Sequence, residues 1–232
     1  MKNKFAIGIL FLTLFVFAML VSCSKSIETY YPLKEGMIWE YQNTFGSHAI
    51  KGAEKTIITN LASQKLKGKK VTPQKVEIGG QSHLSFLTED ADGLYEFTEQ
   101  QPVSVGQEKK SSPFYIIKYP IKAGTTWERM TKTSLSNVPV TLKYTIESID
   151  ENVTVPAGTF KGCVKVNGVG DTKTNFNIFG GTIIITITVE HFSWYAPKVG
   201  LVKSIIKEKS SHIYEAGEWD MTMQMESFKK SK

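Results

Sequence analysis

A stretch late in the chain decides the fold class: residues 183–190 read Ile-Ile-Ile-Thr-Ile-Thr-Val-Glu. Every second residue, from Ile183 to Val189, is β-branched and apolar, and the residues between them are mostly polar. Because successive side chains of a strand point to opposite faces, this order gives one apolar face and one polar face. It is typical of an antiparallel sheet that has one face on a core and the other in water.

The same alternation recurs along the chain, for example in residues 140–147 and 219–226, and no long stretch beyond the N-terminus has the period of a helix. Turn signals fall between these runs, where glycine supplies the positive φ that tight hairpins need. The predicted turns are Gly79-Gly80, Asp92-Gly93, Val155-Pro156-Ala157-Gly158, Gly180-Gly181 and Ala216-Gly217. The sequence therefore predicts an all-β fold with a single antiparallel meander domain, either a curved half-barrel or a β-sandwich.

Composition supports a globular protein. The chain has 232 residues, of which 41% are hydrophobic and 22% charged, with a formal net charge of +6 and two cysteines. These values exclude a disordered chain, a collagen and a disulfide-dense scaffold. The length is sufficient for one sizeable core.

The N-terminus predicts export and lipid anchoring. Lys2 and Lys4 precede an apolar run, residues 5–21, which is near the short limit for a membrane span. The run ends in Leu20-Val21-Ser22-Cys23, which resembles the bacterial lipobox. The resemblance implies diacylglycerol on the Cys23 thiol, cleavage before Cys23 and acylation, such as with palmitate, of the new amino terminus. The alternative is an ordinary secretory signal followed by a chance cysteine.

The anchor also predicts location and domain boundaries. Ser24, rather than Asp, follows Cys23, which in the usual Gram-negative sorting rule implies the outer membrane. We expect a signal peptide at 1–22, a lipidated cysteine with a short tether at 23–30 and one β domain at 31–232. Residues 24–30 reach about 23 Å at most, so the domain should lie near the membrane. With Cys23 lipidated, Cys163 has no disulfide partner, and we expect it to be a small buried core residue.

A repeat divides the predicted domain into two related halves. Residues 31–40 and 119–128 share the pattern Y-P-[LI]-K-x-G-x-x-W-E, and residues 195–200 echo it more weakly. Proline and glycine set a turn, and tryptophan opens a strand with a large apolar anchor. The motif residues for which we predict structural roles are Pro32, Gly36, Trp39, Pro120, Gly124, Trp127, Pro156, Gly158, Phe160, Pro197 and Gly200.

Three of these motifs carry a family resemblance. Y-P-L-x-x-G-x-x-W-x-Y from Tyr31, V-P-A-G-T-F from Val155 and W-Y-A-P-x-V-G-L-V-K from Trp194 resemble the signature of a widespread group of uncharacterised bacterial envelope lipoproteins. The resemblance spans most of the mature chain. It implies an envelope location and a β fold, but no chemistry. A curved antiparallel sheet on a lipid anchor is also similar to the carrier and receptor proteins of lipoprotein sorting.

The sequence favours neither an enzyme nor a metal protein. The four histidines have no metal-ligand spacing, and no nucleophile elbow, P-loop or dinucleotide fingerprint is present. Residues 88–99 partly match a calcium loop, but a hairpin turn at Asp92-Gly93 explains the same residues. We therefore predict no catalytic residue, no metal and no cofactor.

A methionine stripe is the one candidate ligand surface. Trp219, Met221, Met223 and Met225 alternate with polar residues, which predicts a core-facing strand or the lining of an apolar cavity; copper binding is a third interpretation. Two functions stay open: a non-enzymatic envelope lipoprotein with a structural or partner-binding role, and a carrier of an apolar ligand such as a lipid. The expected partners are the membrane, an envelope protein or that ligand, and not nucleic acid.

Overall fold

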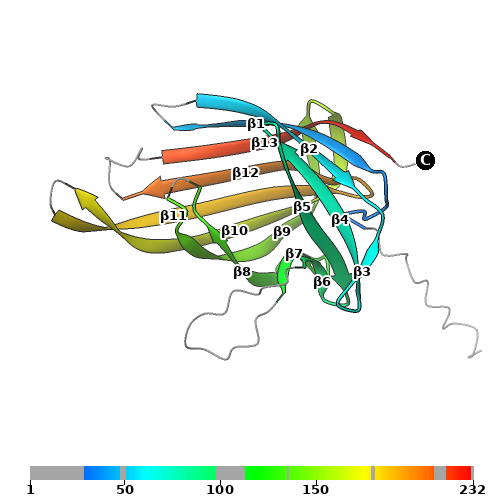
Figure 1. The fold of residues 1–232 in the computed structure, drawn as a ribbon, viewed down its shortest axis with the longest axis horizontal. Coiled ribbons are helices and arrows are strands. Elements are labelled where there is room, and N and C mark those ends of the chain that lie inside the picture. The colour runs from blue at the N-terminus through cyan, green and yellow to red at the C-terminus, as the bar shows by residue number, and fades with distance from the viewer. Residues whose placement is uncertain are drawn as a thin grey trace, which may run out of the picture.

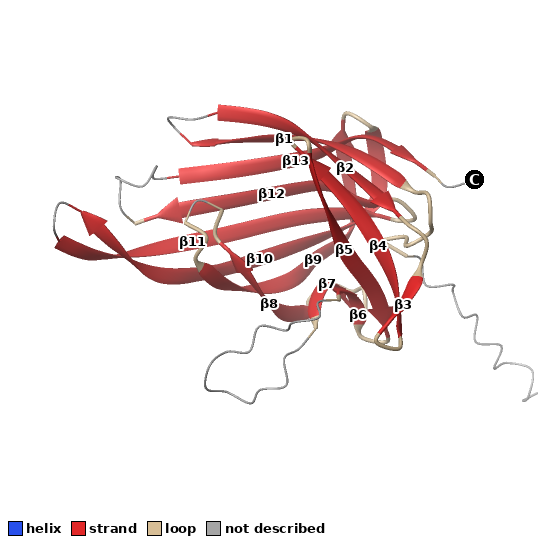
Figure 2. Ribbon diagram, in the orientation of Figure 1, coloured by secondary structure: helices blue, strands red, loops and turns tan. Residues whose placement is uncertain are grey.

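The computed structural model describes residues 29–47, 51–97, 113–134, 136–178, 181–211 and 218–230. Every regular element within these ranges is a β-strand (Figure 2). The strands are β1 (Ile38–Ser47), β2 (Lys51–Asn60), β3 (Gln64–Leu66), β4 (Lys69–Ile78), β5 (Gln81–Asp90), β6 (Gly93–Glu96), β7 (Phe114–Lys118), β8 (Thr126–Lys132), β9 (Pro139–Val155), β10 (Gly158–Ile178), β11 (Gly181–Ala196), β12 (Gly200–Ser210) and β13 (Glu218–Lys229). In this described part, nothing helical has the length and hydropathy to cross a bilayer.

The strands form one antiparallel sheet that curls into a nearly closed barrel (Figure 1). Neighbours in the sheet follow the chain, as in a meander, and β13 pairs with β1 to join the last strand to the first. The sheet ends at β7 and β8, between which the described backbone forms no ladder. The prediction of an all-β fold with a single antiparallel meander is confirmed. The sheet closes further than a half-barrel would, and because the strands belong to one continuous sheet, they do not form a β-sandwich.

Side-chain alternation places the core inside the barrel. On β9 the apolar set Val140, Leu142, Tyr144 and Ile146 is buried, as the sequence predicted. Burial of an aliphatic side chain of this size contributes about 1.5–3 kcal/mol. Cys163 is fully buried as well, in agreement with its predicted core position.

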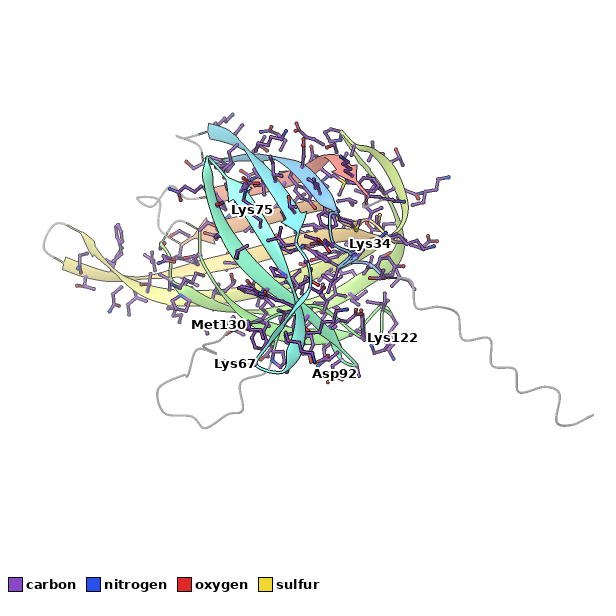
Figure 3. All side chains as sticks on the ribbon, turned by 45° about the vertical axis from the view of Figure 1, so that its right-hand side comes forward. Lys34, Lys67, Lys75, Asp92, Lys122 and Met130 are labelled. Atoms are coloured by element: carbon purple, nitrogen blue, oxygen red, sulfur yellow. The ribbon has the colours of Figure 1, made fainter. Side chains whose placement is uncertain are left out.

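The two repeat copies build the same local structure. Gly36 and Gly124 both adopt a positive φ, of 75° and 87°. Each glycine precedes a strand, β1 or β8, and its N–H donates to a carbonyl of the strand that pairs with it, β2 or β9: Gly36 to Asn60 at 2.9 Å, and Gly124 to Ile146 at 2.8 Å. Each copy therefore starts a meander half, β1 to β7 and β8 to β13. Lys34 and Lys122, equivalent residues of the two copies, lie on the same side of the barrel in Figure 3.

The two tryptophans of the repeat are anchored in the same way. Both are buried, and both donate their indole N–H to a backbone carbonyl: Trp39 to Val199 at 2.7 Å, and Trp127 to Tyr115 at 2.9 Å. Tyr115 belongs to β7, so the second bond spans the open seam between β7 and β8. The weaker third copy of the pattern, residues 195–200, contacts the first copy, because Gly200 lies against the Trp39 ring.

The segment before β1 covers one end of the barrel. The Lys198 N–H, in the turn between β11 and β12, donates to the Thr29 carbonyl at 2.8 Å. The Asn60 side-chain amide donates to the carbonyls of Pro32 and Lys34, at 3.1 and 3.0 Å. The Tyr31 ring packs between those of Trp39 and Tyr195, with 6.3 Å between centroids in each case.

Candidate functional site

A cavity of about 100 Å³ lies inside the barrel between β8, β9, β11 and β12. Its walls combine charged, polar and apolar side chains. They are Arg129, Thr131, Lys132, Ser134, Leu142, Tyr144, Val189, His191, Ile206 and Glu208. Drug-sized ligands need cavities of about 300–1,000 Å³, so this volume suits a small group or part of a larger molecule.

His191 is the centre of a buried hydrogen-bond network. Its Nδ1 lies 3.0 Å from the Tyr144 hydroxyl, and its Nε2 lies 3.0 Å from the hydroxyls of both Ser193 and Ser204. Burial lowers the pKa of His191, with a smaller contribution from the positive charge of Arg129, to about 4. The imidazole is therefore neutral at neutral pH.

Glycine makes room for this network. Gly168 on β10 pairs with Tyr144 on β9 and with His191 on β11. A Cβ atom on Gly168 would lie 2.5 Å from the Tyr144 ring, so the missing side chain lets tyrosine lie across β10. Trp127 stacks on the other side of that ring, with 5.5 Å between centroids and 13° between planes. The Tyr144 hydroxyl is thereby held at the histidine.

The network contains a serine–histidine contact, a pairing that also occurs in catalytic sites. Serine next to histidine is the pairing of a nucleophile and its base. Here the orienting group on the other ring nitrogen is a neutral phenol, since burial raises the pKa of Tyr144. Ser193 and Ser204 are themselves only 3% and 4% exposed. The arrangement joins β9, β11 and β12 through side-chain hydrogen bonds across the barrel interior.

Charged residues of both signs line the cavity, and no ion pair within 4 Å joins Arg129 to Glu208. Glu208, which is 5% exposed, accepts a hydrogen bond of 2.6 Å from the Ser134 N–H. Arg129 lies half-buried on the inward face of β8, two residues from the buried Trp127. No ion pair within 4 Å links Arg129 to a carboxylate of the described residues.

The predicted methionine stripe faces the same interior. Met225 is fully buried in a core cluster with Trp39 and Tyr41. Met223, Met221 and Trp219 are half-buried, and they pair with Ser204, Ile206 and Glu208 of β12. The stripe thus runs from the core to the edge of the cavity.

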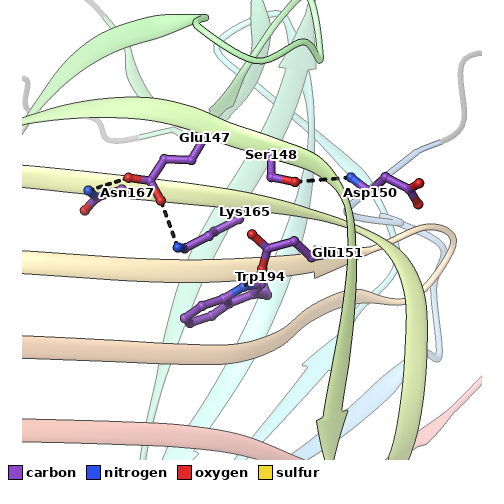
Figure 4. A network of polar contacts seen from close by, with 7 residues as sticks. All are labelled: Glu147, Ser148, Asp150, Glu151, Lys165, Asn167 and Trp194. Atoms are coloured by element: carbon purple, nitrogen blue, oxygen red, sulfur yellow. Dashed lines mark hydrogen bonds and ion pairs between the residues drawn. The ribbon is translucent and has the colours of Figure 1, made fainter.

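A second polar network lies on the outside of the sheet (Figure 4). The Lys165 ammonium forms an ion pair of 2.9 Å with Glu147, which lowers the pKa of that carboxyl, and Asn167 donates to Glu147 at 2.8 Å. The Trp194 indole N–H donates to Glu151 at 2.7 Å. The same lysine lies over the Trp194 ring, 5.7 Å from its centroid. These contacts tie β9, β10 and β11 together at the surface, where each ion pair contributes about 0–1 kcal/mol.

The structure places the other motif residues at turns and strand entries. Pro156 forms the turn from β9 to β10, and Pro197 the turn from β11 to β12. Gly158 and Gly200, which open β10 and β12, have φ values of 128° and 107°. Phe160 packs on the Phe228 ring, 6.2 Å away between centroids. Cys23 lies outside the described residues, as does the turn predicted at Ala216-Gly217.

The cavity itself was missed by sequence reasoning, although a signal was present. The alternation read from Ile183 to Val189 continues to His191 and Ser193, which places both on the inward face. A polar residue that continues the alternation of a core-facing strand indicates a buried hydrogen-bond network, because buried polar groups require partners. The partners Tyr144 and Arg129 come from distant strands, and no local pattern joins them.

Comparisons with known proteins show weak similarities. No curated protein matches the chain. A solved structure from Bacteroides fragilis NCTC 9343, of a protein thought to be exported and with a YmcC-like fold, is 15% identical; the match covers 88% of this chain and 100% of that one, with a TM-score of 0.47. A second, of a protein from Parabacteroides distasonis ATCC 8503 thought to be a lipoprotein, is 14% identical, covers 87% and 99% of the two chains and has a TM-score of 0.42. Residues 145–215, from within β9 to just beyond β12, match the model of the DUF3108-like family.

Proposed function

We propose that this chain is a lipid-anchored, non-enzymatic protein of the bacterial envelope, held at the outer membrane. The observation that carries the proposal is Leu20-Val21-Ser22-Cys23 at the end of an apolar run. Cys23 lies six residues before Thr29, a distance of about 20 Å at most for an extended chain. The Thr29 carbonyl accepts a hydrogen bond from Lys198 in the turn between β11 and β12. The end of the barrel at this turn would therefore lie near the bilayer.

Labelling with palmitate tests the anchor. We expect the wild-type protein to incorporate labelled palmitate and to sediment with membranes. Cys23→Ser should abolish incorporation, whereas Cys163→Ser should leave it unchanged because that thiol is buried. Continued labelling of Cys23→Ser would overturn the proposal.

For the molecular role, we propose a non-enzymatic barrel that supports envelope structure or binds a partner protein. Both ring nitrogens of His191 have hydrogen-bond partners, and its serines are buried. These features suit a structural network better than a reaction centre. In-cell crosslinking of the anchored protein, followed by mass spectrometry, would identify the partner. Recovery of crosslinks only within the chain itself would contradict the partner-binding role.

The second candidate is a carrier of an apolar ligand, such as a lipid. The observation that favours it is the half-buried stripe of Trp219, Met221 and Met223 beside the interior cavity. Native mass spectrometry of residues 24–232, which hold every described strand, tests it directly. An added mass that extracts into organic solvent would support a carrier. A bare mass in repeated preparations would favour the structural role.

A further inference from the structure

We infer that the cavity binds the anionic head group of an amphiphile, a fatty-acid-type carboxylate, with the Arg129 guanidinium as its counter-ion. The inference rests on the carrier alternative and adds to it the chemistry of the ligand. Three features of the cavity support it. They are the positive charge of Arg129, the lack of charge on the neighbouring His191 and Tyr144 side chains, and the apolar surface that continues from Arg129.

Arg129 is a half-buried cation that forms no ion pair within 4 Å with the residues that the structure describes. Arginine stays ionised in proteins, and a charge withdrawn from water is costly unless it is paired. The described carboxylates include no partner within ion-pair distance of Arg129. Its neighbours in the cavity do not compensate either, because His191 is neutral and Tyr144 keeps its proton.

Glu208 is the carboxylate among the lining residues, and no ion pair within 4 Å joins it to Arg129. Its Oε1 accepts the Ser134 N–H at 2.6 Å, which fixes the side chain toward the turn between β8 and β9. Lys132 is also among the lining residues, but it is exposed and alternates with the inward-facing Arg129 on β8. Arg129 is therefore the inward-facing cation that an anionic group would meet in the cavity.

An apolar surface continues from the charged end. Leu142, Val189 and Ile206 line the cavity beside Arg129. Ile206 pairs with Met221 on β13, and Met221 pairs with Phe45 on β1, both half-buried on the inward face. Two strand spacings of about 4.8 Å extend this surface by about 10 Å beyond Ile206.

Head group and surface together define the ligand. A guanidinium presents two parallel N–H groups that match one carboxylate. The cavity, at about 100 Å³, has room for such a small group and not for a bulky head group. An alkyl chain attached to the carboxylate would then lie along Ile206, Met221 and Phe45.

A matched pair of ligands tests this inference. Residues 24–232 are titrated with dodecanoic acid and with dodecanol at pH 7.5, by calorimetry without detergent. The two ligands have the same chain and differ in the head group. We expect the acid to bind at least about tenfold more tightly than the alcohol, because only the acid pairs with Arg129.

Variants locate the effect. Arg129→Gln should lower the affinity for the acid about tenfold and leave that for the alcohol unchanged, and Arg129→Lys should retain part of the preference because it keeps the charge. Lys207→Gln is the matched control, since Lys207 is the neighbour of Ile206 on the outward face. It should change neither affinity. Melting temperatures of all variants would show that they fold.

The outcomes are distinct. Equal binding of acid and alcohol by the wild type would overturn the head-group inference and leave the carrier proposal standing. Preference for the acid that persists in Arg129→Gln would also overturn it. Absence of binding by both ligands would overturn the inference together with the carrier proposal. The wild-type comparison decides the question even if the Arg129 variants do not fold.

Discussion

At the scale of single residues, the barrel interior contains more polar chemistry than its apolar pattern suggests. His191, Ser193 and Ser204 lie on core-facing positions of β11 and β12, and each has a hydrogen-bond partner. A buried network of this kind stabilises a fold when it is complete and destabilises it when one member changes charge. The histidine is the member that can change charge within the ordinary pH range.

His191 should make the fold sensitive to acid. Its pKa falls from 6.5 to about 4 on folding, so the unfolded chain takes up the proton first as the pH drops. The contribution of His191 is complete above pH 6.5 and is lost between pH 6.5 and pH 4, by up to about 3 kcal/mol. Urea unfolding at pH 7 and pH 4.5 measures this loss. His191→Gln should reduce the difference between the two pH values by about 2 kcal/mol; an unchanged difference would show that another group is responsible.

The Cys163 thiol should not react with alkylating reagents in the folded protein. Burial raises the pKa of its thiol to about 11, with a smaller contribution from the Glu151 charge, and the residue has no exposed surface. The thiolate is the reactive form, so both effects suppress alkylation. Mass spectrometry after iodoacetamide treatment at pH 8 should find residues 24–232 unmodified in buffer and singly modified in concentrated urea. Rapid modification in buffer would contradict the buried position.

At the scale of elements, each copy of the repeat, residues 31–40 and 119–128, forms the turn and the strand entry with which one half of the barrel begins. In each copy a glycine with positive φ turns the chain, and its N–H donates to a carbonyl of the strand that pairs with the one it precedes. The tryptophan of each copy donates its indole N–H to a backbone carbonyl. The two copies differ in what they join. Trp39 ties β1 to the turn between β11 and β12, whereas Trp127 ties β8 to β7 across the seam.

The two indole hydrogen bonds should matter measurably. Trp39→Phe and Trp127→Phe each leave a carbonyl without its donor, which costs about 1–3 kcal/mol when the group is buried. Trp194→Phe is the control, because its acceptor Glu151 is a side chain that can turn to water. It should cost under about 1 kcal/mol. Urea midpoints of the three variants give the comparison, and equal losses in all three would contradict a special role for the repeat tryptophans.

At the scale of the whole molecule, closure is unequal on the two sides of the barrel. β13 and β1 pair along their length, from Ser47 to Ile38. At the opposite junction, β7 is five residues long and forms no ladder with β8. Edge strands expose backbone groups that central strands share with neighbours. The seam is therefore where the barrel should open first.

Hydrogen exchange measures this asymmetry. Amides of β7 should exchange faster than those of residues 221–225 in β13, because local opening at an edge breaks fewer bonds. Trp127→Phe should accelerate exchange in β7 further and leave β13 unchanged. Equal protection of the two strands would indicate that the seam is closed in solution.

Much of this organisation can be read from the sequence. Alternation in residues 140–147 and 183–190 is a local property, and it fixes strand character and the inward face whatever the strand pairs with. Turns at Gly79-Gly80 and Asp92-Gly93 are likewise local, and both form hairpins. The lipobox predicts the anchor in the same local way, and Cys23 stays a prediction since it lies outside the described residues.

Only the tertiary structure decided how far the sheet closes and which side chains meet in its interior. Pairing of β13 with β1 joins residues nearly the whole chain apart, and no short pattern specifies such a contact. The same holds for the cavity, where Arg129, His191 and Glu208 come from three strands. Sequence determines which face each side chain occupies, since that depends on neighbours along the chain. Which faces meet depends on curvature and closure, and these are set by the sheet as a whole.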